Sequence, residues 1–566
     1  MNIRITLLTC LILTSAALMT SCSADKIADI SDITNTPADP DSVYSYVWHA
    51  DVPAGGVSYS GYDASRANII IEELEKYAEK PDPSEVPDID PQTAVPLLVD
   101  SLLEETDKLY TQLQLLYIDY YRDANDEEIS ELTTDIEEKN IDVSDRALQV
   151  LRDVMKGPYG SIVKKDLTKD QREYLRDYED MTKEEQKLYK EESDLVQKYD
   201  KLSLNSADYQ DDNKKFVNIF KALVSNRSRQ AELYDYDSFA DYAYENLYAR
   251  DYTADDAAAL YDDVKKYIVP LYVQSVEDLY EADVMRILLY NDSGDDILKA
   301  IDPYIEQIDP QLNSAFNYLR RHHMYDLDAS PTKMDVGYTV DLPQYGAQYI
   351  FNAPYEEAAD YSVAIHEFGH FNAGFHQSQH SLFSAEASLD IAEIQSQGLE
   401  LLFLDYYDEL FGQDADLIRA ETLSNMLSGV VTGCMYDEFQ QVVFADPDMS
   451  RKEINRLAAR LSKEYGLTES GVISQADARF DWVSVPHTFE SPMYYISYAT
   501  SALSALDIWT ESLDDRDAAI DKYMDVSALS LDTPYLEGLE KCGLRNIFEE
   551  GTVKDIANQI EKRSMQ

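Results

Sequence analysis

Residues 360–371 read DYSVAIHEFGHF, in which two histidines four positions apart enclose a glutamate. On a helix, His366 and His370 project about 40° apart around the axis, so both imidazoles can bind one metal ion. Glu367 lies beside them, within reach of a water on that metal. This H-E-x-x-H pattern is typical of zinc sites. The alternative is a surface helix whose two histidines share no ligand.

A zinc site needs a third protein ligand and an open position for water. His376 is one candidate, because it follows His366 by ten residues, as the third histidine does in metzincins, although the glycine of that pattern is displaced by one position. Glu393 is the other candidate. It belongs to a row of glutamates spaced by seven on a predicted helix at 384–410, and the row consists of Glu386, Glu393 and Glu400. Such a row either faces water or binds a partner such as zinc, and spacing alone leaves both ligand candidates open.

The segment before the histidines predicts a small antiparallel ribbon. Val, Thr, Tyr, Ile and Phe are concentrated at 336–342 and 348–351, with turn residues nearby. The acidic residues that follow Pro354 favour the start of a helix, because they meet the positive end of its dipole. We expect this helix to run to about Phe371, with Gly374 providing a left-handed exit.

The rest of the chain is dominated by amphipathic patterns, with apolar residues at three- and four-residue steps. The predicted helices lie at 67–78, 97–121, 144–155, 168–202 and 216–248. Strand-like sequence is otherwise scarce, and 566 residues contain only 19 Gly and 19 Pro. We therefore expect a mainly α-helical protein.

The charge of the chain excludes one class of partner. There are 108 acidic and 48 basic residues, which gives a net charge of −60. So strong a negative field repels phosphate backbones, and we expect no nucleic-acid binding. The 45% of hydrophobic residues are enough to bury a large core.

The first residues resemble a bacterial export signal. Arg4 precedes an apolar stretch, Ile5–Met19, that is too short to span a membrane as a stable helix. The following residues, ending in Cys22, resemble a lipoprotein signal box, so we expect a signal peptide at 1–21 and a lipid anchor on Cys22. The alternative is an ordinary cleaved signal with an incidental cysteine. The polar residues 22–42 are expected to form a flexible tether.

Two cysteines, Cys434 and Cys542, remain for the folded part of the chain. They allow one disulfide at most, and their spacing does not establish it.

Residues 393–400, EIQSQGLE, are similar to the E-x-x-S-Q-x-x-E block of a known family, that of thimet oligopeptidase and oligoendopeptidase F. These proteins are zinc metallopeptidases that cut short peptides. The resemblance implies that Glu393 is the third ligand of a single zinc ion. It also implies that His376 belongs to the wall of the site.

A second block near the C-terminus extends the resemblance. His487 precedes YYISYA at 494–499, which is similar to the family's histidine followed by an aromatic Y-x-x-Y segment. By this likeness His487, Tyr495 and Tyr498 carry the oxyanion-donor and substrate-positioning roles.

Upstream the likeness is weaker. One helix pattern of the family is matched by Arg227, Ala231, Tyr236 and Phe239, with Asp235 in place of the usual glycine. Lys333 and the pair Gly337-Tyr338 resemble, with altered spacing, a family loop that lines bound peptide. Gly337 and Tyr338 are therefore predicted substrate contacts.

The resemblance implies a two-lobed helical peptidase with a deep substrate channel and a small antiparallel ribbon next to the zinc helix. The expected division of the chain is a signal peptide at 1–21, a tether at 22–42, an N-terminal helical region at 43–215 and a zinc peptidase region at 216–566.

The signal sequence and the family resemblance together predict an exported, lipid-anchored zinc oligoendopeptidase that faces outward. It would cleave internal bonds of short unfolded peptides. A metal-activated water would attack the peptide bond, with Glu367 as the general base. Two alternatives remain: a catalytically inactive peptide-binding lipoprotein on the same scaffold, and a metzincin-like protease of folded proteins with His376 as third ligand.

Overall fold

The computed structural model describes Val52 and residues 56–80, 90–123, 125–177, 182–282, 284–334, 336–377, 380–383, 388–530 and 533–564. The predicted signal peptide, Cys22 and the tether at 22–42 lie outside these residues. Within the described ranges, no helix combines the length and the apolar character needed to cross a membrane.

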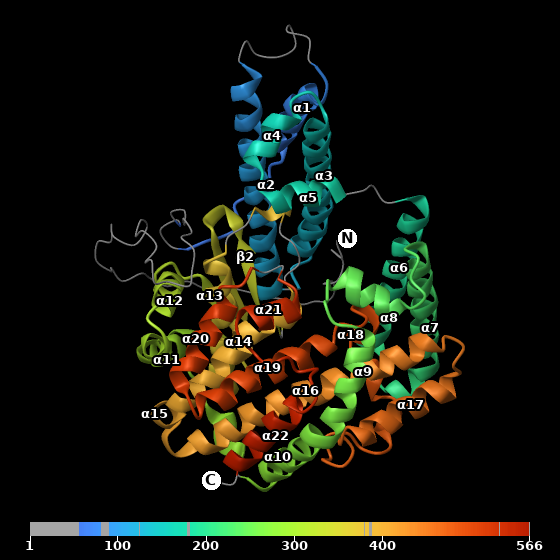
Figure 1. Ribbon diagram of the computed structural model, residues 1–566, viewed down its shortest axis with the longest axis vertical. Coiled ribbons are helices and arrows are strands. Elements are labelled where there is room, and N and C mark those ends of the chain that lie inside the picture. Colours follow the sequence, from blue (N-terminus) through green and yellow to red (C-terminus); the bar gives the residue numbers. More distant parts are fainter. Residues whose placement is uncertain are drawn as a thin grey trace.

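Helices make up most of the structure, and a small sheet lies among them (Figure 1). The helices before the sheet are α1 (Ser65–Ala78), α2 (Pro91–Arg122), α3 (Glu127–Lys156), α4 (Gly160–Asp166), α5 (Lys169–Asp177), α6 (Lys183–Asn205), α7 (Tyr209–Leu233), α8 (Phe239–Tyr242), α9 (Ala254–Asp263), α10 (Val269–Glu281), α11 (Gly294–Ile308) and α12 (Leu312–Arg321). Those after it are α13 (Ala359–Phe375), α14 (Leu389–Phe403), α15 (Tyr407–Phe411), α16 (Ala415–Ala445), α17 (Arg451–Glu464), α18 (His487–Glu490), α19 (Ile496–Ser512), α20 (Arg516–Ser527), α21 (Tyr535–Lys541) and α22 (Thr552–Ser564). The prediction of a mainly α-helical fold is confirmed.

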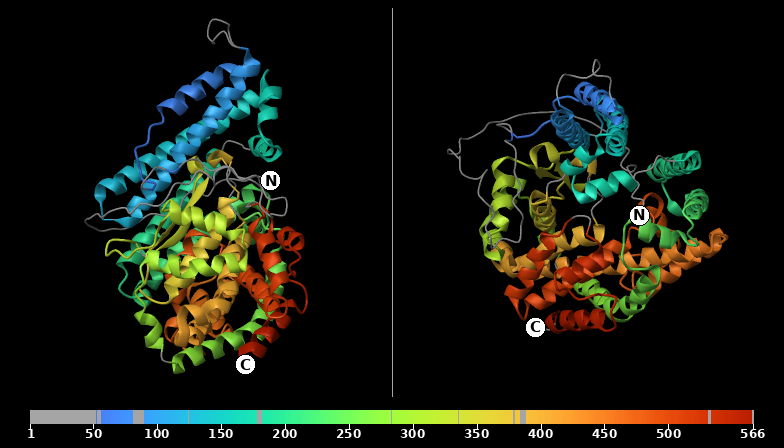
Figure 2. Two further views of the ribbon diagram at one scale, coloured as in Figure 1. Left: turned by 90° about the vertical axis from the view of Figure 1, so that its left-hand side faces the viewer. Right: turned by 45° about the horizontal axis from the view of Figure 1, so that its top comes forward.

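Helices α1 to α5 form an elongated part that projects from the main body, at the top of Figure 1 and again in Figure 2. This part has a core of its own, which includes Leu74 of α1, Leu102 of α2 and Leu151 of α3. Leu382 and Phe383, from the short 3₁₀ helix η5 (Ser381–Phe383), also belong to this core. A segment that lies between α13 and α14 in the sequence therefore docks into the N-terminal helices.

A larger core fills the main body. It joins Phe220 of α7, Phe368 of α13, Leu399 of α14 and Leu503 of α19. Tyr199 of α6 belongs to the same core. The predicted division after residue 215 falls inside α7, which packs along α6.

The sheet consists of β1 (Tyr325–Asp326), β2 (Gly337–Leu342) and β3 (Ala347–Asn352) in the order β1-β3-β2. Strands β2 and β3 are antiparallel, with Thr339 opposite Ile350, as the ribbon prediction required. The two-residue strand β1 pairs with β3 in parallel and is too short for an alternating pattern to reveal. Helices α2 and α13 both pack against β2.

Two predicted helices are wrong in their continuity. The stretch 168–202 contains two helices, α5 and α6, and α6 begins with a capping box in which Thr182 accepts a hydrogen bond from the amide of Glu185. The stretch 216–248 is interrupted after α7, where Asp235 has φ of 62°. Aspartate tolerates this left-handed conformation better than most residues, and it stands here where the resembling family has glycine.

The role expected of Gly374 is also wrong. Helix α13 continues to Phe375, so Gly374 lies inside it and ends nothing. A Cβ atom on Gly374 would come within 2.0 Å of Nε2 of Gln348 on β3. The glycine therefore allows α13 to lie close against the sheet.

Cys434 and Cys542 are both buried and both free. The one disulfide that the sequence allowed is absent from the described residues.

Candidate metal centre

The proposed metal ligands come from two helices in close contact. Helix α13 carries the two histidines and α14 carries Glu393. Between them lies Gly369, whose hypothetical Cβ atom would be 2.6 Å from the carbonyl oxygen of Gln395 and 2.7 Å from Cα of Ser396. Both atoms belong to the backbone of α14, so the two helices can approach this closely only because residue 369 is glycine.

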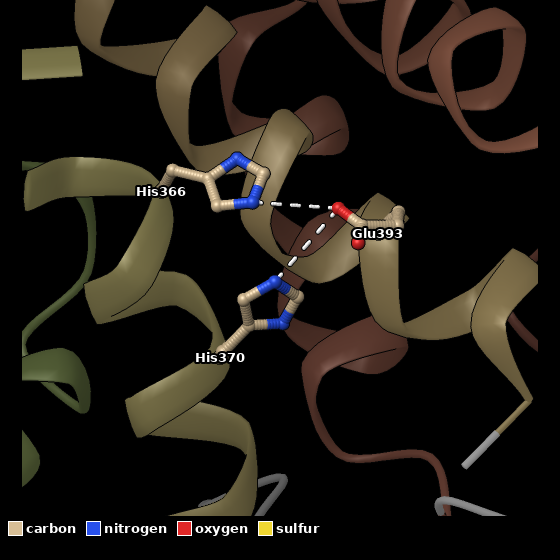
Figure 3. A group of neighbouring side chains, drawn as sticks. All are labelled: His366, His370 and Glu393. Carbon is tan, nitrogen blue, oxygen red and sulfur yellow. Dashed lines mark ion pairs between the residues drawn. The ribbon is translucent and has the colours of Figure 1, made fainter. Parts of the chain in front are cut away.

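The three side chains converge on one point (Figure 3). Atom Nε2 of His366 is 3.4 Å from Oε2 of Glu393, and Nε2 of His370 is 3.8 Å from the same oxygen. Ligands of a tetrahedral zinc at about 2.1 Å lie about 3.4 Å from one another, so these separations suit zinc. Among the residues that the structure describes, one group of three or more His, Cys, Asp or Glu side chains has its ligand atoms close enough to hold a metal ion, and it is this one.

A fourth side chain orients the first histidine. Nδ1 of His366 is 2.7 Å from Oε1 of Glu400. With the proton on Nδ1, the imidazole donates to this carboxylate and turns Nε2 toward Glu393, an arrangement that commonly fixes metal-binding histidines. In the glutamate row, Glu393 is thus placed to bind the metal and Glu400 to orient His366. Glu386 lies outside the described residues.

Burial and charge act against each other in this cluster. Burial alone would raise the pKa of Glu393, but the neighbouring imidazoles outweigh it and lower that pKa to about 2. Burial lowers the pKa of His366, but Glu393 and Glu400 outweigh it and raise that pKa well above its usual value. Burial lowers the pKa of His370, with a contribution from His366. The carboxylates thus attract positive charge, which a divalent cation supplies when it displaces the imidazole proton.

The proposed general base is held by the ribbon. The Thr339 hydroxyl on β2 donates to Oε2 of Glu367 at 2.6 Å, which leaves Oε1 as the other oxygen of this buried carboxylate. A Cβ atom on Gly337 would lie 3.7 Å from that Oε1 and 2.7 Å from Oδ1 of Asn352. Gly337, a predicted substrate contact, therefore borders the base. Thr339 was not predicted, although its place two residues from Gly337 puts both on one strand face.

Two other residues of the predicted substrate loop point elsewhere. Tyr338 lies on the opposite face of β2, where its ring packs 5.3 Å from that of Tyr121 on α2. Lys333 is buried, and its ammonium donates to Oδ1 of Asp326 at 2.7 Å and to the carbonyl oxygen of Asn352 at 2.6 Å. Lys333 thus ties β1 to the end of β3, and its donors are engaged within the protein.

The predicted oxyanion donors form one aromatic cluster at the start of α19. The ring centroid of His487 lies 5.2 Å from that of Tyr495 and 6.2 Å from that of Tyr498. Tyr494, which was not predicted, has its ring centroid 5.1 Å from that of His487 and 5.4 Å from that of Tyr498. Burial and the Glu393 carboxylate raise the pKa of Tyr498 to about 12, so its hydroxyl keeps its proton at neutral pH. Burial lowers the pKa of His487, which keeps this imidazole neutral.

His376 occupies a different place. It caps the C-terminal end of α13, and its ring lies 5.1 Å from that of Phe375. The metal-binding group of the described residues contains Glu393 in the third position and does not contain His376. The metzincin-like arrangement is therefore not formed.

Comparison with known proteins agrees with this geometry. Residues 325–524 match the model of peptidase family M3, and this region contains β1 to β3 and both metal-binding helices. No curated protein sequence matches the chain at a significant level. Members of family M3 are zinc metallopeptidases.

Solved structures share the fold over most of their length. A protein assigned as an oligoendopeptidase F has a TM-score of 0.69 at 22% identity, and the match covers 89% of this chain and 97% of that one. Pz peptidase A with an inhibitor has a TM-score of 0.69 at 20% identity, covering 90% and 98%. A protein assigned as an oligoendopeptidase F from Bacillus anthracis strain Ames has a TM-score of 0.67 at 19% identity, covering 90% and 98%.

The match to a peptidase family and the converging His366, His370 and Glu393 thus define a metallopeptidase. The likeness to peptidase family M3 lies in residues 325–524, which are less than half of the chain.

Proposed function

We propose that the chain is an exported, zinc-dependent oligoendopeptidase that hydrolyses internal bonds of short unfolded peptides. The observation that carries the proposal is the convergence of His366, His370 and Glu393 beside Glu367. Two imidazoles and one carboxylate with a fourth position for water are the ligand set of a catalytic zinc. When bound, zinc lowers the pKa of a water ligand toward about 7 and polarises the scissile carbonyl.

The side chains of the chain supply the proton transfers. Oε1 of Glu367 accepts the proton of the attacking water, while Thr339 holds Oε2. The same oxygen then delivers the proton to the leaving amine. The Tyr498 hydroxyl, assisted by Tyr495 or His487, donates to the developing oxyanion, and one such donor is typically worth about 3 kcal/mol.

The ribbon suggests how a peptide is held. The order β1-β3-β2 places β2 at a sheet edge, and Gly337 is exposed on β2 beside the Glu367 carboxylate. A peptide that adds to this edge is bound through its main chain, so many side chains are tolerated. We propose that substrates enter as extended peptides through a channel too narrow for folded proteins.

The direct test is cleavage of an internally quenched peptide with both termini blocked, with and without a chelator. We expect chelator-sensitive cleavage that added zinc restores. Glu367→Gln should still bind zinc but lose roughly 100- to 10,000-fold in kcat, because the proton acceptor is gone. Full turnover by this variant would exclude Glu367 as the base. A wild-type protein that binds the peptide without cutting it would instead be a peptide-binding lipoprotein.

Export and lipidation are supported by the sequence of residues 1–22 alone. Fractionation of cells that express the full chain tests them. We expect the wild type in the membrane fraction and Cys22→Ser in the soluble fraction, because the acylated residue is lost. An equal distribution of the two proteins would reject the anchor.

A further inference from the structure

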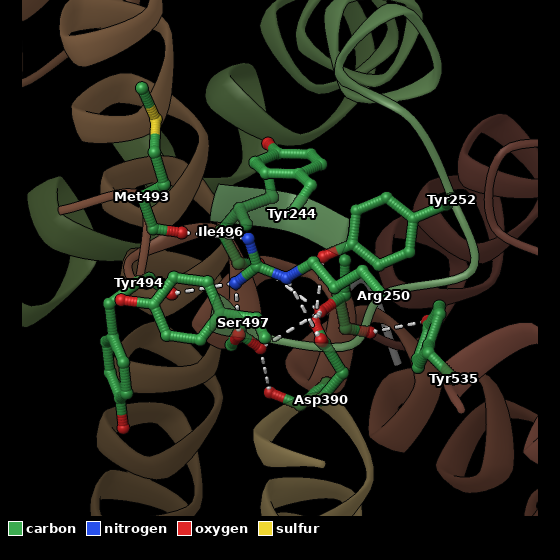
Figure 4. A network of polar contacts seen from close by, with 12 residues as sticks. Tyr244, Arg250, Tyr252, Asp390, Met493, Tyr494, Ile496, Ser497 and Tyr535 are labelled. Atoms are coloured by element: carbon green, nitrogen blue, oxygen red, sulfur yellow. Dashed lines mark hydrogen bonds and ion pairs between the residues drawn. The ribbon is translucent and has the colours of Figure 1, made fainter. Parts of the chain in front are cut away.

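A fully buried arginine contacts both α14, which carries Glu393, and the start of α19, which carries Tyr498 (Figure 4). Arg250 lies in the turn between the π-helical segment η1 (Ala243–Leu247) and α9, and its side chain is 0% exposed. The turn is tight, because Ala249 has φ of 47° and the amide of Arg250 donates to the carbonyl oxygen of Tyr244 at 2.8 Å. Nothing in the proposed reaction uses this guanidinium directly.

One side of Arg250 contacts the helix of the third metal ligand. Its Nε is 3.3 Å from Oδ2 of Asp390, in the first turn of α14 and three residues before Glu393. Tyr252 donates to Oδ1 of Asp390 at 3.1 Å, and the Thr500 hydroxyl donates to the same oxygen. The carboxylate is therefore held from several directions, about one helical turn from the metal ligand.

The other side of Arg250 contacts the segment that carries the tyrosines. One terminal nitrogen donates to the carbonyl oxygen of Met493 at 2.9 Å. The second donates to Oγ of Ser497 at 2.8 Å and is 3.5 Å from the carbonyl oxygen of Tyr494. The contacted residues lie on both sides of Tyr495 in the sequence, and Ser497 is the residue directly before Tyr498.

The surroundings make both contacts costly to break. The guanidinium carbon lies 4.6 Å from the ring centroid of Tyr244 and 4.5 Å from that of Tyr248, so aromatic rings cover it. A charged pair without water strongly disfavours the loss of either partner. The planar fork of arginine can direct donors to both helices at once, whereas lysine has a single ammonium group.

We propose that Arg250 is a positioning residue that sets the metal-binding end of α14 against the tyrosine-bearing start of α19. Through Asp390 it fixes the position of Glu393, and through Met493 and Ser497 it fixes that of Tyr498. The inference rests on the proposed function, in which the metal and the tyrosine act on the same carbonyl. A displacement of about 1 Å between two such groups is enough to lower the rate roughly 100-fold.

Three variants of the full chain separate positioning from mere structure. Arg250→Lys weakens both contacts and keeps the positive charge. Ser497→Ala removes only the side-chain contact with α19, because Oγ of Ser497 bonds to Arg250. The control is Tyr535→Phe. It removes the hydrogen bond that the Tyr535 hydroxyl donates to the carbonyl oxygen of Thr500 and the hydrogen bond between that hydroxyl and Oγ of Ser504, both on α19, without touching Arg250.

For each variant we would measure zinc affinity by competition with a chromophoric chelator, kcat and KM at saturating zinc, and the thermal midpoint. We expect Arg250→Lys to lose roughly 10- to 100-fold in zinc affinity and in kcat. Ser497→Ala should retain zinc affinity and lose kcat several-fold with little change in KM. Tyr535→Phe should lower the thermal midpoint and leave zinc affinity and kcat unchanged.

The readouts distinguish the two levels of proposal. If Arg250→Lys and Ser497→Ala differ from the wild type no more than Tyr535→Phe does, Arg250 has no positioning role. If the wild type cleaves no peptide, the proposed function fails. The link from Arg250 to the metal ligand still stands in that case if Arg250→Lys weakens zinc binding and Ser497→Ala and Tyr535→Phe do not.

Discussion

Gly369 shows how a single residue without a side chain can define a metal site. It occupies one of the two variable positions of the H-E-x-x-H pattern, at the point where the backbones of α13 and α14 meet. The metal ligands also lie where α13 and α14 meet. The separation of the helices therefore controls the distance from Glu393 to the two imidazoles.

We predict that Gly369→Ala weakens metal binding. The added methyl would lie 2.6 Å from the Gln395 carbonyl oxygen, so α14 must move and take Glu393 with it. Overpacking of this kind costs about 1–3 kcal/mol, and we expect a loss of zinc affinity of roughly 5- to 150-fold by chelator competition. Gly429→Ala is the control, because its methyl would meet only the Tyr498 carbonyl oxygen at 3.9 Å. Equal zinc affinities of the two variants would contradict the prediction.

The residues of the site differ in how far the sequence reveals them. His366 and His370 follow from helical spacing alone, and the choice of Glu393 over His376 required the family block. Thr339 is different, because its bond to Glu367 depends on how β2 packs against α13. No local pattern encodes that tertiary contact.

At the scale of elements, the segment between α13 and α14 joins the site to the N-terminal helices. Nδ1 of His380 is 2.7 Å from Oδ2 of Asp107 on α2, and the amide and hydroxyl of Ser381 donate to the other oxygen at 2.8 and 2.9 Å. The bond to Asp107 raises the pKa of His380. Leu382 and Phe383 then enter the core of the N-terminal helices. The position of these helices is thus coupled to the segment that connects the two metal-binding helices.

A second carboxyl group near this contact predicts a pH dependence of stability. Burial and the proximity of Asp107 raise the pKa of Asp341 on β2 to about 7. The native state thus binds this proton more tightly than the unfolded chain, where the pKa is about 3.9, and stability falls as pH rises from about 4 to about 7. We expect Asp341→Asn to raise the thermal midpoint clearly at about pH 8 and only slightly at about pH 5.

The measurement is thermal unfolding of the wild type and the variant at both pH values. Asp416→Asn is the control, since its side chain is 98% exposed and its ion pair with Arg419 lies at the surface, so any change of the midpoint should be small and the same at both pH values. A gain from Asp341→Asn that is the same at both pH values would reject the titration of this group as the cause.

Element boundaries were less predictable than element types. The amphipathic patterns located most helices, but they did not reveal the breaks at Thr182 and after Leu233. These breaks depend on single residues, Thr182 as an N-cap and Asp235 in a left-handed conformation, within otherwise continuous apolar periodicity. The N-terminal core also includes Leu382 and Phe383, which lie far away in the sequence. Such a contact has no local signature.

At the scale of the whole molecule, acidic residues far outnumber basic ones, and some of the basic residues are buried. The net charge is −60. Arg250 and Lys333 are buried and paired with Asp390 and Asp326, so they contribute little to the outer field. Any peptide that approaches the site therefore moves through a negative potential, which acts on its rate of association.

We predict that basic peptides are cleaved more efficiently than acidic ones at low ionic strength. Two quenched peptides with the same central bond, flanked by Lys in one and Glu in the other, isolate the effect, and a neutral peptide is the control. At about 10 mM salt we expect kcat/KM to be at least about tenfold higher for the Lys peptide, since electrostatic attraction raises association rates by about 10- to 1,000-fold. The ratio should approach one at about 0.5 M salt, where the Debye length is only a few ångströms. A ratio of one at low salt would exclude steering, and a ratio that salt does not change would place the preference in direct contacts within the site.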